Sequence, residues 1–106
     1  MKSLIIVALA LTVMASADPF DAEKYRTGYV DVETGEIFYW LFESRGTPST
    51  DPLVIWLNGG PGSSSMLGLF YENGPYTFAN DENMEDTSLK TNPFSWNENA
   101  NVIFVD

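Results

Sequence analysis

Glycines, serines and an asparagine gather in residues 56–65 (WLNGGPGSSS), and this run is the part of the chain best suited to chemistry. Glycine at three of its positions permits positive φ and close approach by another backbone or a ligand. Backbone N–H groups exposed in such a loop, at the N-terminus of a helix, favour an anion or a developing oxyanion. A tight turn with no chemical role fits the same residue types, so both interpretations stay open.

Two familiar glycine-loop chemistries are excluded by spacing. A phosphate-binding P-loop requires a lysine after its last glycine, whereas Gly62 is followed by serines. A nucleophile elbow requires glycine two places on either side of its serine, but Ser64 has Met66 on its far side. The chain also has no histidine, which removes the usual base for activating a serine and the commonest metal ligand.

The residues on either side of this loop predict a strand before it and a helix after it. Residues 53–57 form an uninterrupted apolar run, which is typical of a strand covered on both faces. Met66, Leu69 and Phe70 recur at helical spacing. Residues 73–75 (NGP) then provide a helix stop. In an α/β sheet this junction lies at the carboxyl end of a strand, where ligands bind.

The predicted helix has a second side, formed by Ser64, Gly68, Tyr71 and Glu72, that faces away from its apolar residues. Glycine in a helix interior costs about 1 kcal/mol relative to alanine, so we expect another group to approach closely at Gly68. Glu72 would be a carboxylate beside the anion site, and it could share that site with a carboxylate ligand only if one of the two carried a proton. Taken alone, Glu72 also fits an exposed helix residue.

Strands are predicted on both sides of this central region. Residues 27–32 and 36–44 read as a hairpin joined across residues 33–35 (ETG). Both faces of the second strand are apolar, so it is expected to be covered on both faces. Residues 102–105 predict a last strand, and Asp106 would be the first polar residue of a loop after it.

The segment between the helix and the last strand is polar. Residues 80–91 are acidic and almost without aliphatic side chains, which predicts an exposed loop. Residues 92–96 (NPFSW) predict a turn, with Phe94 and Trp96 as aromatic anchors.

Composition limits the partners and the source of stability. The net charge of −10 argues against nucleic acid as a partner, because a polyanion is repelled by an acidic surface. The chain has no cysteine, so stability must come from the core rather than from disulfides. At 106 residues the chain is one small domain at most, and its end directly after a strand suggests the front part of a longer chain.

Residues 1–17 are predicted to be a signal peptide. Lys2 precedes an apolar stretch over residues 4–13, and residues 15–17 (ASA) are small, as a signal peptidase requires. The apolar stretch is shorter than the roughly 20 residues that span a bilayer, so a membrane anchor is the weaker interpretation. The mature chain would then begin at Asp18, and residues 18–106 would be its folded part.

Residues 56–65 together with residues 68–75 (GLFYENGP) resemble the serine carboxypeptidase family, of the vacuolar carboxypeptidase Y type. Supporting matches run through the rest of the mature chain: residues 29–32 (YVDV), 38–44 (FYWLFES), 92–97 (NPFSWN) and 101–106 (NVIFVD). The resemblance covers almost all of residues 18–106, but only the opening part of a family member.

The resemblance implies the N-terminal part of an α/β-hydrolase fold, with the first strands of the central sheet and the oxyanion-loop helix. Such enzymes release C-terminal amino acids from peptides through an acyl-enzyme and a Ser-His-Asp triad, without a cofactor or metal. It implies that the Gly60 backbone N–H forms half of the oxyanion hole. The positions that match the binding site for the substrate's C-terminal carboxylate are Trp56, Asn58, Gly59 and Glu72. The positions that match the pocket for the departing residue are Leu67 and Tyr71.

Two departures limit what is implied. The family usually has cysteine where Ser63 stands, and that cysteine normally forms a disulfide, so this loop lacks the family's disulfide. The nucleophile elbow, the second carboxylate that partners Glu72, and the catalytic Asp and His all lie beyond Asp106 in the family. The segment alone is therefore expected to be inactive, and to fold poorly with aromatic surface around Trp40, Phe42 and Trp56 exposed.

The leading hypothesis is a serine carboxypeptidase of the secretory pathway, located in a vacuole or lysosome or outside the cell, that acts on peptide or protein C-termini. A carboxypeptidase-like acyltransferase has a similar front segment and remains an alternative, although the carboxylate-binding positions Asn58 and Glu72 favour the peptidase. A truncated, non-catalytic product is the other alternative.

Overall fold

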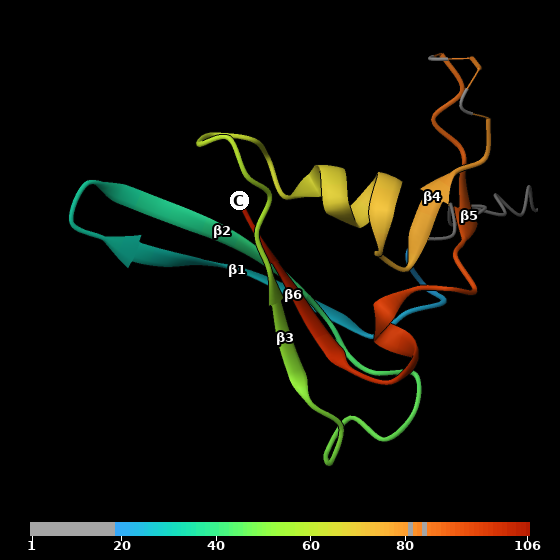
Figure 1. The fold of residues 1–106 in the computed structure, drawn as a ribbon, viewed down its shortest axis with the longest axis horizontal. Helices are drawn as coiled ribbons and strands as arrows, with labels where there is room; N and C mark the ends of the chain where they lie inside the picture. Colours follow the sequence, from blue (N-terminus) through green and yellow to red (C-terminus); the bar gives the residue numbers. More distant parts are fainter. Residues whose placement is uncertain (1–18, 81, 84) are drawn as a thin grey trace, which may run out of the picture.

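A mixed four-stranded sheet forms the centre of the chain in the computed structural model, which describes residues 19–80, 82–83 and 85–106 (Figure 1). The strand order is β1-β2-β6-β3, with β1–β2 and β2–β6 antiparallel and β3–β6 parallel. The signal peptide predicted for residues 1–17 lies outside the described residues. The strands are β1 Tyr25–Val32, β2 Gly35–Phe42, β3 Leu53–Trp56 and β6 Asn101–Val105.

The strands predicted from the sequence are confirmed, with boundaries shifted by a few residues. The hairpin closes where Val32 pairs with Gly35, and Gly35 has a φ of 155°. β6 lies between β2 and β3, so the last strand of the chain joins the hairpin to the strand before the glycine loop. Because β3 and β6 are parallel neighbours, Trp56 and Val105 end at the same edge of the sheet.

One face of the sheet is covered by the segment that follows the glycine loop. This segment contains a short α-turn at Met66 and Leu67 and then η1, a π-helix over Gly68–Glu72 (Figure 1). The N–H of Asn73 donates to the Gly68 carbonyl at 3.0 Å, so the helix ends where the NGP stop predicts. Helical spacing predicts the helix but not its π-type hydrogen bonding. The helix contributes Leu69 to the buried hydrophobic core, whose other members are Phe42, Tyr76, Ala100, Val102 and Phe104.

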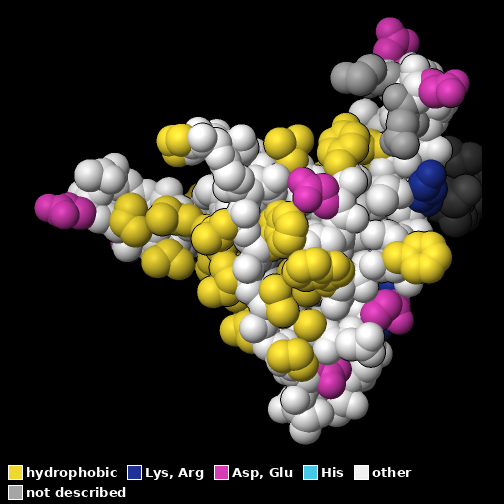
Figure 2. Space-filling view, viewed as in Figure 1, with side chains coloured by type: hydrophobic (Ala, Val, Ile, Leu, Met, Phe, Trp, Pro, Cys, Tyr) yellow, Lys and Arg dark blue, Asp and Glu magenta, His cyan; other side chains and the backbone are white. Residues whose placement is uncertain are grey.

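The opposite face of the sheet is open. Leu53 and Ile55 are 60% and 61% exposed, and hydrophobic side chains gather over the hairpin and β3 in Figure 2. The expectation that residues 53–57 are covered on both faces is therefore wrong for the described chain, whereas in the second strand residues 38–41 are half-buried, Phe42 is buried and Ile37 is exposed. The expectation that Trp40, Phe42 and Trp56 expose aromatic surface is also wrong, because Phe42 is fully buried and Trp40 and Trp56 are half-buried.

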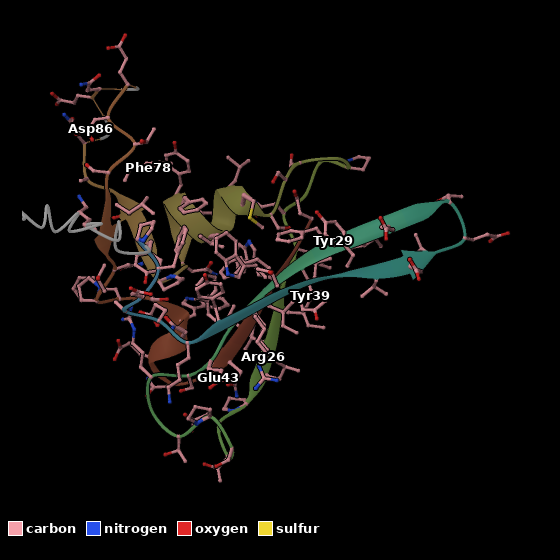
Figure 3. All side chains as sticks on the ribbon, turned by 180° about the vertical axis from the view of Figure 1, so that it is seen from behind. Arg26, Tyr29, Tyr39, Glu43, Phe78 and Asp86 are labelled. Atoms are coloured by element: carbon pink, nitrogen blue, oxygen red, sulfur yellow. The ribbon has the colours of Figure 1, made fainter. Side chains whose placement is uncertain are left out.

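A second, two-stranded sheet pairs β4, Tyr76–Phe78, with β5, Leu89–Thr91. The prediction of one exposed loop over residues 80–91 is thus wrong at its end, where Leu89 to Thr91 pair with β4. Figure 3 shows the remaining loop, with Asp86, projecting away from the body of the molecule.

The turn that precedes β6 contains η2, a 3-10 helix over Trp96–Glu98. Phe94 is 88% exposed, so it is not an anchor within the described residues. Trp96 is half exposed but packs edge-on against Trp56, with ring centroids 5.3 Å apart. One of the two predicted anchors therefore contacts the strand before the glycine loop.

Arg45 connects the start of the described chain to this turn through hydrogen bonds and ion pairs. Its Nε donates to Glu23 Oε1 at 2.8 Å, and its backbone N–H donates to the Asn97 carbonyl at 2.7 Å. It also pairs with Glu98, while Asn97 donates to the second Glu23 oxygen at 2.8 Å. Burial acts to lower the pKa of Arg45, but the hydrogen bonds and charges of Glu23 and Glu98 outweigh it, so the pKa lies above its ordinary value. The charged form of the guanidinium is therefore stabilised by its two glutamate partners.

Across the described ranges, no helix is long and apolar enough to cross a membrane.

Candidate functional site

The glycine loop, residues 59–64, begins at the carboxyl end of β3 and stands out from the sheet (Figure 1). Gly60 and Gly62 have φ angles of 134° and 87°, in the region that disfavours residues with a Cβ atom. The Gly60–Pro61 peptide bond is cis. Within the described chain, the N–H groups of Gly59, Gly60 and Gly62 donate to no other protein group. The loop therefore presents free backbone donors to solvent.

The N–H groups at the start of the helix are, by contrast, already occupied. Ser65 N–H donates to Asp106 Oδ1 at 3.0 Å, and Met66 N–H donates to Ser64 Oγ at 3.2 Å. Gly68 N–H donates to Asn58 Oδ1 at 3.2 Å. The sequence predicts exposed N–H groups in a loop that leads into a helix, and the donors left for a ligand are those of the loop rather than those of the helix itself. A carboxylate of the chain itself occupies the favourable position at the helix start.

A side-chain network lies directly beside these donors. The indole N–H of Trp56 donates to Asn58 Oδ1 at 2.8 Å, and Asn58 Nδ2 donates to Glu72 Oε1 at 3.2 Å. Since Asn58 Oδ1 also accepts from Gly68, the orientation of its amide is determined by donors on one side and a carboxylate on the other. Glu72 is exposed, which leaves its carboxylate open to a ligand.

The close approach predicted at Gly68 is confirmed, and the approaching group is Trp56. A Cβ atom built on Gly68 would lie 2.0 Å from the indole Nε1, so alanine does not fit without movement. Trp56 is held between the helix at Gly68 and the ring of Trp96. The π-helix and β3 are thus packed tightly enough to align the indole N–H with Asn58.

Leu67 and Tyr71 lie on the outer side of the helix, 47% and 60% exposed. The Tyr71 ring packs against Phe78 of β4 with centroids 5.3 Å apart, and Figure 3 shows Phe78 beside the helix. Ser63 is also exposed, in the loop itself. Apolar and aromatic side chains therefore border the polar network on one side.

Reasoning from the sequence missed three residues that shape this site: Ser65, Asp106 and Trp96. Ser65 Oγ accepts from the Asn58 N–H at 3.1 Å. A serine before an apolar helical repeat predicts an N-cap, whereas this hydroxyl binds the residue before the loop, so no sequence signal indicates its role. Asp106 follows a buried strand at the same sheet edge as the loop, which is where polar ligands of a site are expected. No sequence signal links Trp96 to Trp56.

A loop of free backbone donors, at the carboxyl end of a parallel strand and beside an asparagine–carboxylate pair, is the kind of arrangement that can receive an anion. The family model for serine carboxypeptidase matches residues 16–106, so the chain belongs to the serine carboxypeptidase family.

Similar proteins agree with this assignment. The chain is 51% identical over 88 residues to carboxypeptidase Y homolog A of Pyrenophora tritici-repentis, covering 81% of this chain and 15% of that protein. It is 53% identical over 87 residues to carboxypeptidase Y of Schizosaccharomyces pombe, covering 81% of this chain and 8% of that protein. It matches the crystal structure of a prohormone-processing carboxypeptidase from Saccharomyces cerevisiae with a TM-score of 0.63 and 31% identity, over 85% of this chain and 20% of that one. The chain thus spans a small part of each.

Proposed function

We propose that this chain supplies the oxyanion-binding and substrate-carboxylate-binding elements of a serine carboxypeptidase, which releases C-terminal amino acids from peptides through an acyl-enzyme. The Gly60 N–H is one donor to the developing oxyanion. The side chain of Asn58, the backbone of Gly59 and the carboxyl group of Glu72 bind the C-terminal carboxylate. Trp56 orients Asn58, and Leu67 and Tyr71 border the pocket for the departing residue. The substrates are peptide or protein C-termini, reached in the secretory pathway, a vacuole or lysosome, or outside the cell.

The observation that supports this proposal best is the connected network from Trp56 through Asn58 to Glu72, next to unoccupied loop donors. A plain turn would not require an asparagine whose carbonyl and amide groups are both engaged. The Asn58 amide and the Glu72 carboxyl group lie side by side. They can bind a substrate carboxylate if that carboxylate and Glu72 share a proton.

Replacing Glu72 with Gln tests this assignment in the protein expressed from its complete reading frame. In the wild type, kcat/KM for a peptide should fall as pH rises, because loss of the shared proton brings two negative charges together. Glu72→Gln keeps a neutral donor and should flatten that dependence. The C-terminal amide of the same peptide lacks the carboxylate, so its kcat/KM should follow one pH profile in both proteins.

Identical pH responses for the peptide and its amide in the wild type would leave Glu72 as an exposed helix residue and overturn the carboxylate assignment. Transfer of an acyl group to an alcohol acceptor, without release of C-terminal residues, would instead identify an acyltransferase. Glu82→Gln, a change in the exposed outer loop, is the matched control and should leave both profiles unchanged.

The 106-residue chain by itself should release no amino acid from a blocked dipeptide, because it contains no histidine to activate a serine. Turnover is measured by amino-acid release, with a Gly60→Ala form as the background. Turnover above that background would show that the chain carries its own nucleophile and base, and would contradict the proposed division of the site.

A further inference from the structure

The glycine loop has little packing of its own. The one backbone hydrogen bond between its described residues runs from Ser63 N–H to the Gly59 carbonyl, at 3.2 Å. A Cβ atom added at Gly59 or Gly62 would meet nothing within 4 Å. A segment with so few contacts takes its position from the residues at its two ends.

Ser65 joins those two ends. It is 2% exposed, and its Oγ accepts from the N–H of Asn58 at 3.1 Å, which ties the residue before the loop to the residue after it. Its carbonyl accepts from Leu69 N–H at 3.2 Å, so it is also part of the helix. Its own N–H donates to Asp106 Oδ1 at 3.0 Å. One buried serine therefore connects the loop, the helix and the end of β6.

Asp106 is fixed from the other side. Its N–H donates to the Phe38 carbonyl at 2.9 Å, and its carbonyl accepts from the Phe38 N–H at 3.1 Å. The backbone of Asp106 is thus paired with β2 in both directions, and Figure 1 shows this end of the chain next to the glycine loop. The carboxylate projects from a sheet position with little freedom to move.

We propose that Asp106 is a positioning residue that acts through Ser65. It fixes the position of the glycine loop relative to the sheet, so that the Gly60 N–H points toward the reacting oxygen. The effect of Asp106 on catalysis rests on the proposed function. Its effect on the position of the glycine loop does not.

The test uses Asp106→Ala and Asp106→Asn in the protein expressed from its complete reading frame. Alanine removes the acceptor for Ser65 N–H, while asparagine retains an acceptor oxygen and removes only the charge. Asp106→Ala should lower kcat per titrated active site about 10- to 100-fold for a peptide and an ester alike, with little change in KM, because a displaced donor is lost mainly in the transition state. Asp106→Asn should retain kcat within about threefold.

Asp51→Ala is the matched control. Asp51 Oδ2 accepts from Ser44 Oγ at 2.6 Å and from Thr47 N–H at 2.8 Å, in a turn before β3 and away from the loop. This variant should lower the melting temperature without changing kcat per active site. An equal fall in kcat for Asp51→Ala and Asp106→Ala would reduce Asp106 to a general stabilising residue and overturn the proposal.

Amide hydrogen exchange over residues 58–66 separates this proposal from the proposed function. Faster exchange there in Asp106→Ala than in Asp106→Asn or Asp51→Ala supports the positioning role even if the wild type hydrolyses nothing, a result that would overturn only the proposed function. Unchanged exchange in Asp106→Ala overturns the positioning role whatever the activity.

Discussion

Substituting Arg45 with alanine should lower the free energy of unfolding by about 3–5 kcal/mol, the cost of leaving a buried charge without its partner. The Glu23 side chain is 3% exposed and receives the Arg45 guanidinium. Without Arg45, the carboxylate keeps its hydrogen bond from Asn97 but loses its counter-charge. Urea unfolding of the protein expressed from its complete reading frame measures the change.

Arg26→Ala provides the matched control for this prediction. Arg26 also pairs with a glutamate, Glu43, at 3.3 Å, but its side chain is 74% exposed, and Figure 3 shows the two on the outside of the hairpin base. An exposed pair contributes about 0–1 kcal/mol. Adding Glu23→Gln to Arg45→Ala should recover part of the loss, because the unpaired charge is then gone. Equal losses for Arg45→Ala and Arg26→Ala would show that the burial of Glu23 does not determine the effect.

Gly68→Ala should disturb the site more than any other single methyl group added to the helix. Its Cβ would lie 2.0 Å from Trp56 Nε1, so the indole or the helix must move. Overpacking of this kind costs about 1–3 kcal/mol. Movement of the indole also removes the hydrogen bond that orients Asn58, so kcat/KM for peptides should fall about 100-fold.

Gly59→Ala is the control for Gly68→Ala, because it also replaces a glycine with alanine but introduces no steric clash. An added Cβ at Gly59 meets nothing within 4 Å, so the melting temperature should change little, whereas Gly68→Ala should lower it by several degrees. Unfolding curves report stability, and tryptophan fluorescence reports displacement of the indole. If Gly68→Ala leaves both unchanged, Trp56 does not need its position against the helix.

The strands and the helix could be predicted because their patterns are local. Residues 53–57 form one uninterrupted apolar run, and the apolar repeat after the loop has helical spacing. The coverage of each face could not be predicted in the same way, since an apolar run is equally compatible with a covered and an open face. The pairing of β4 with β5 could not be predicted, because β5 is a short strand within a segment whose acidic composition is typical of a loop.

The candidate site could be predicted as a set of residues, but not as an arrangement. The residue types of Asn58 and Glu72 and the resemblance of their flanking sequence identified both, and the structure brings them into contact at 3.2 Å. Asp106 lies far from Ser65 in the sequence, so their contact depends on the parallel pairing of β3 with β6. Long-range pairing of this kind leaves no local pattern.

The central position of β6 has a consequence for biosynthesis. A ribosome delivers β2 and β3 well before β6, yet neither strand pairs with the other, and each must wait for Asn101–Val105 to enter between them. Until then the β1–β2 and β4–β5 pairings can form, because their contacts are close in sequence, but the central sheet cannot. The edges of β2 and β3 that will pair with β6 consequently stay open until β6 emerges, and at that stage a chaperone or a faulty pairing competes for them.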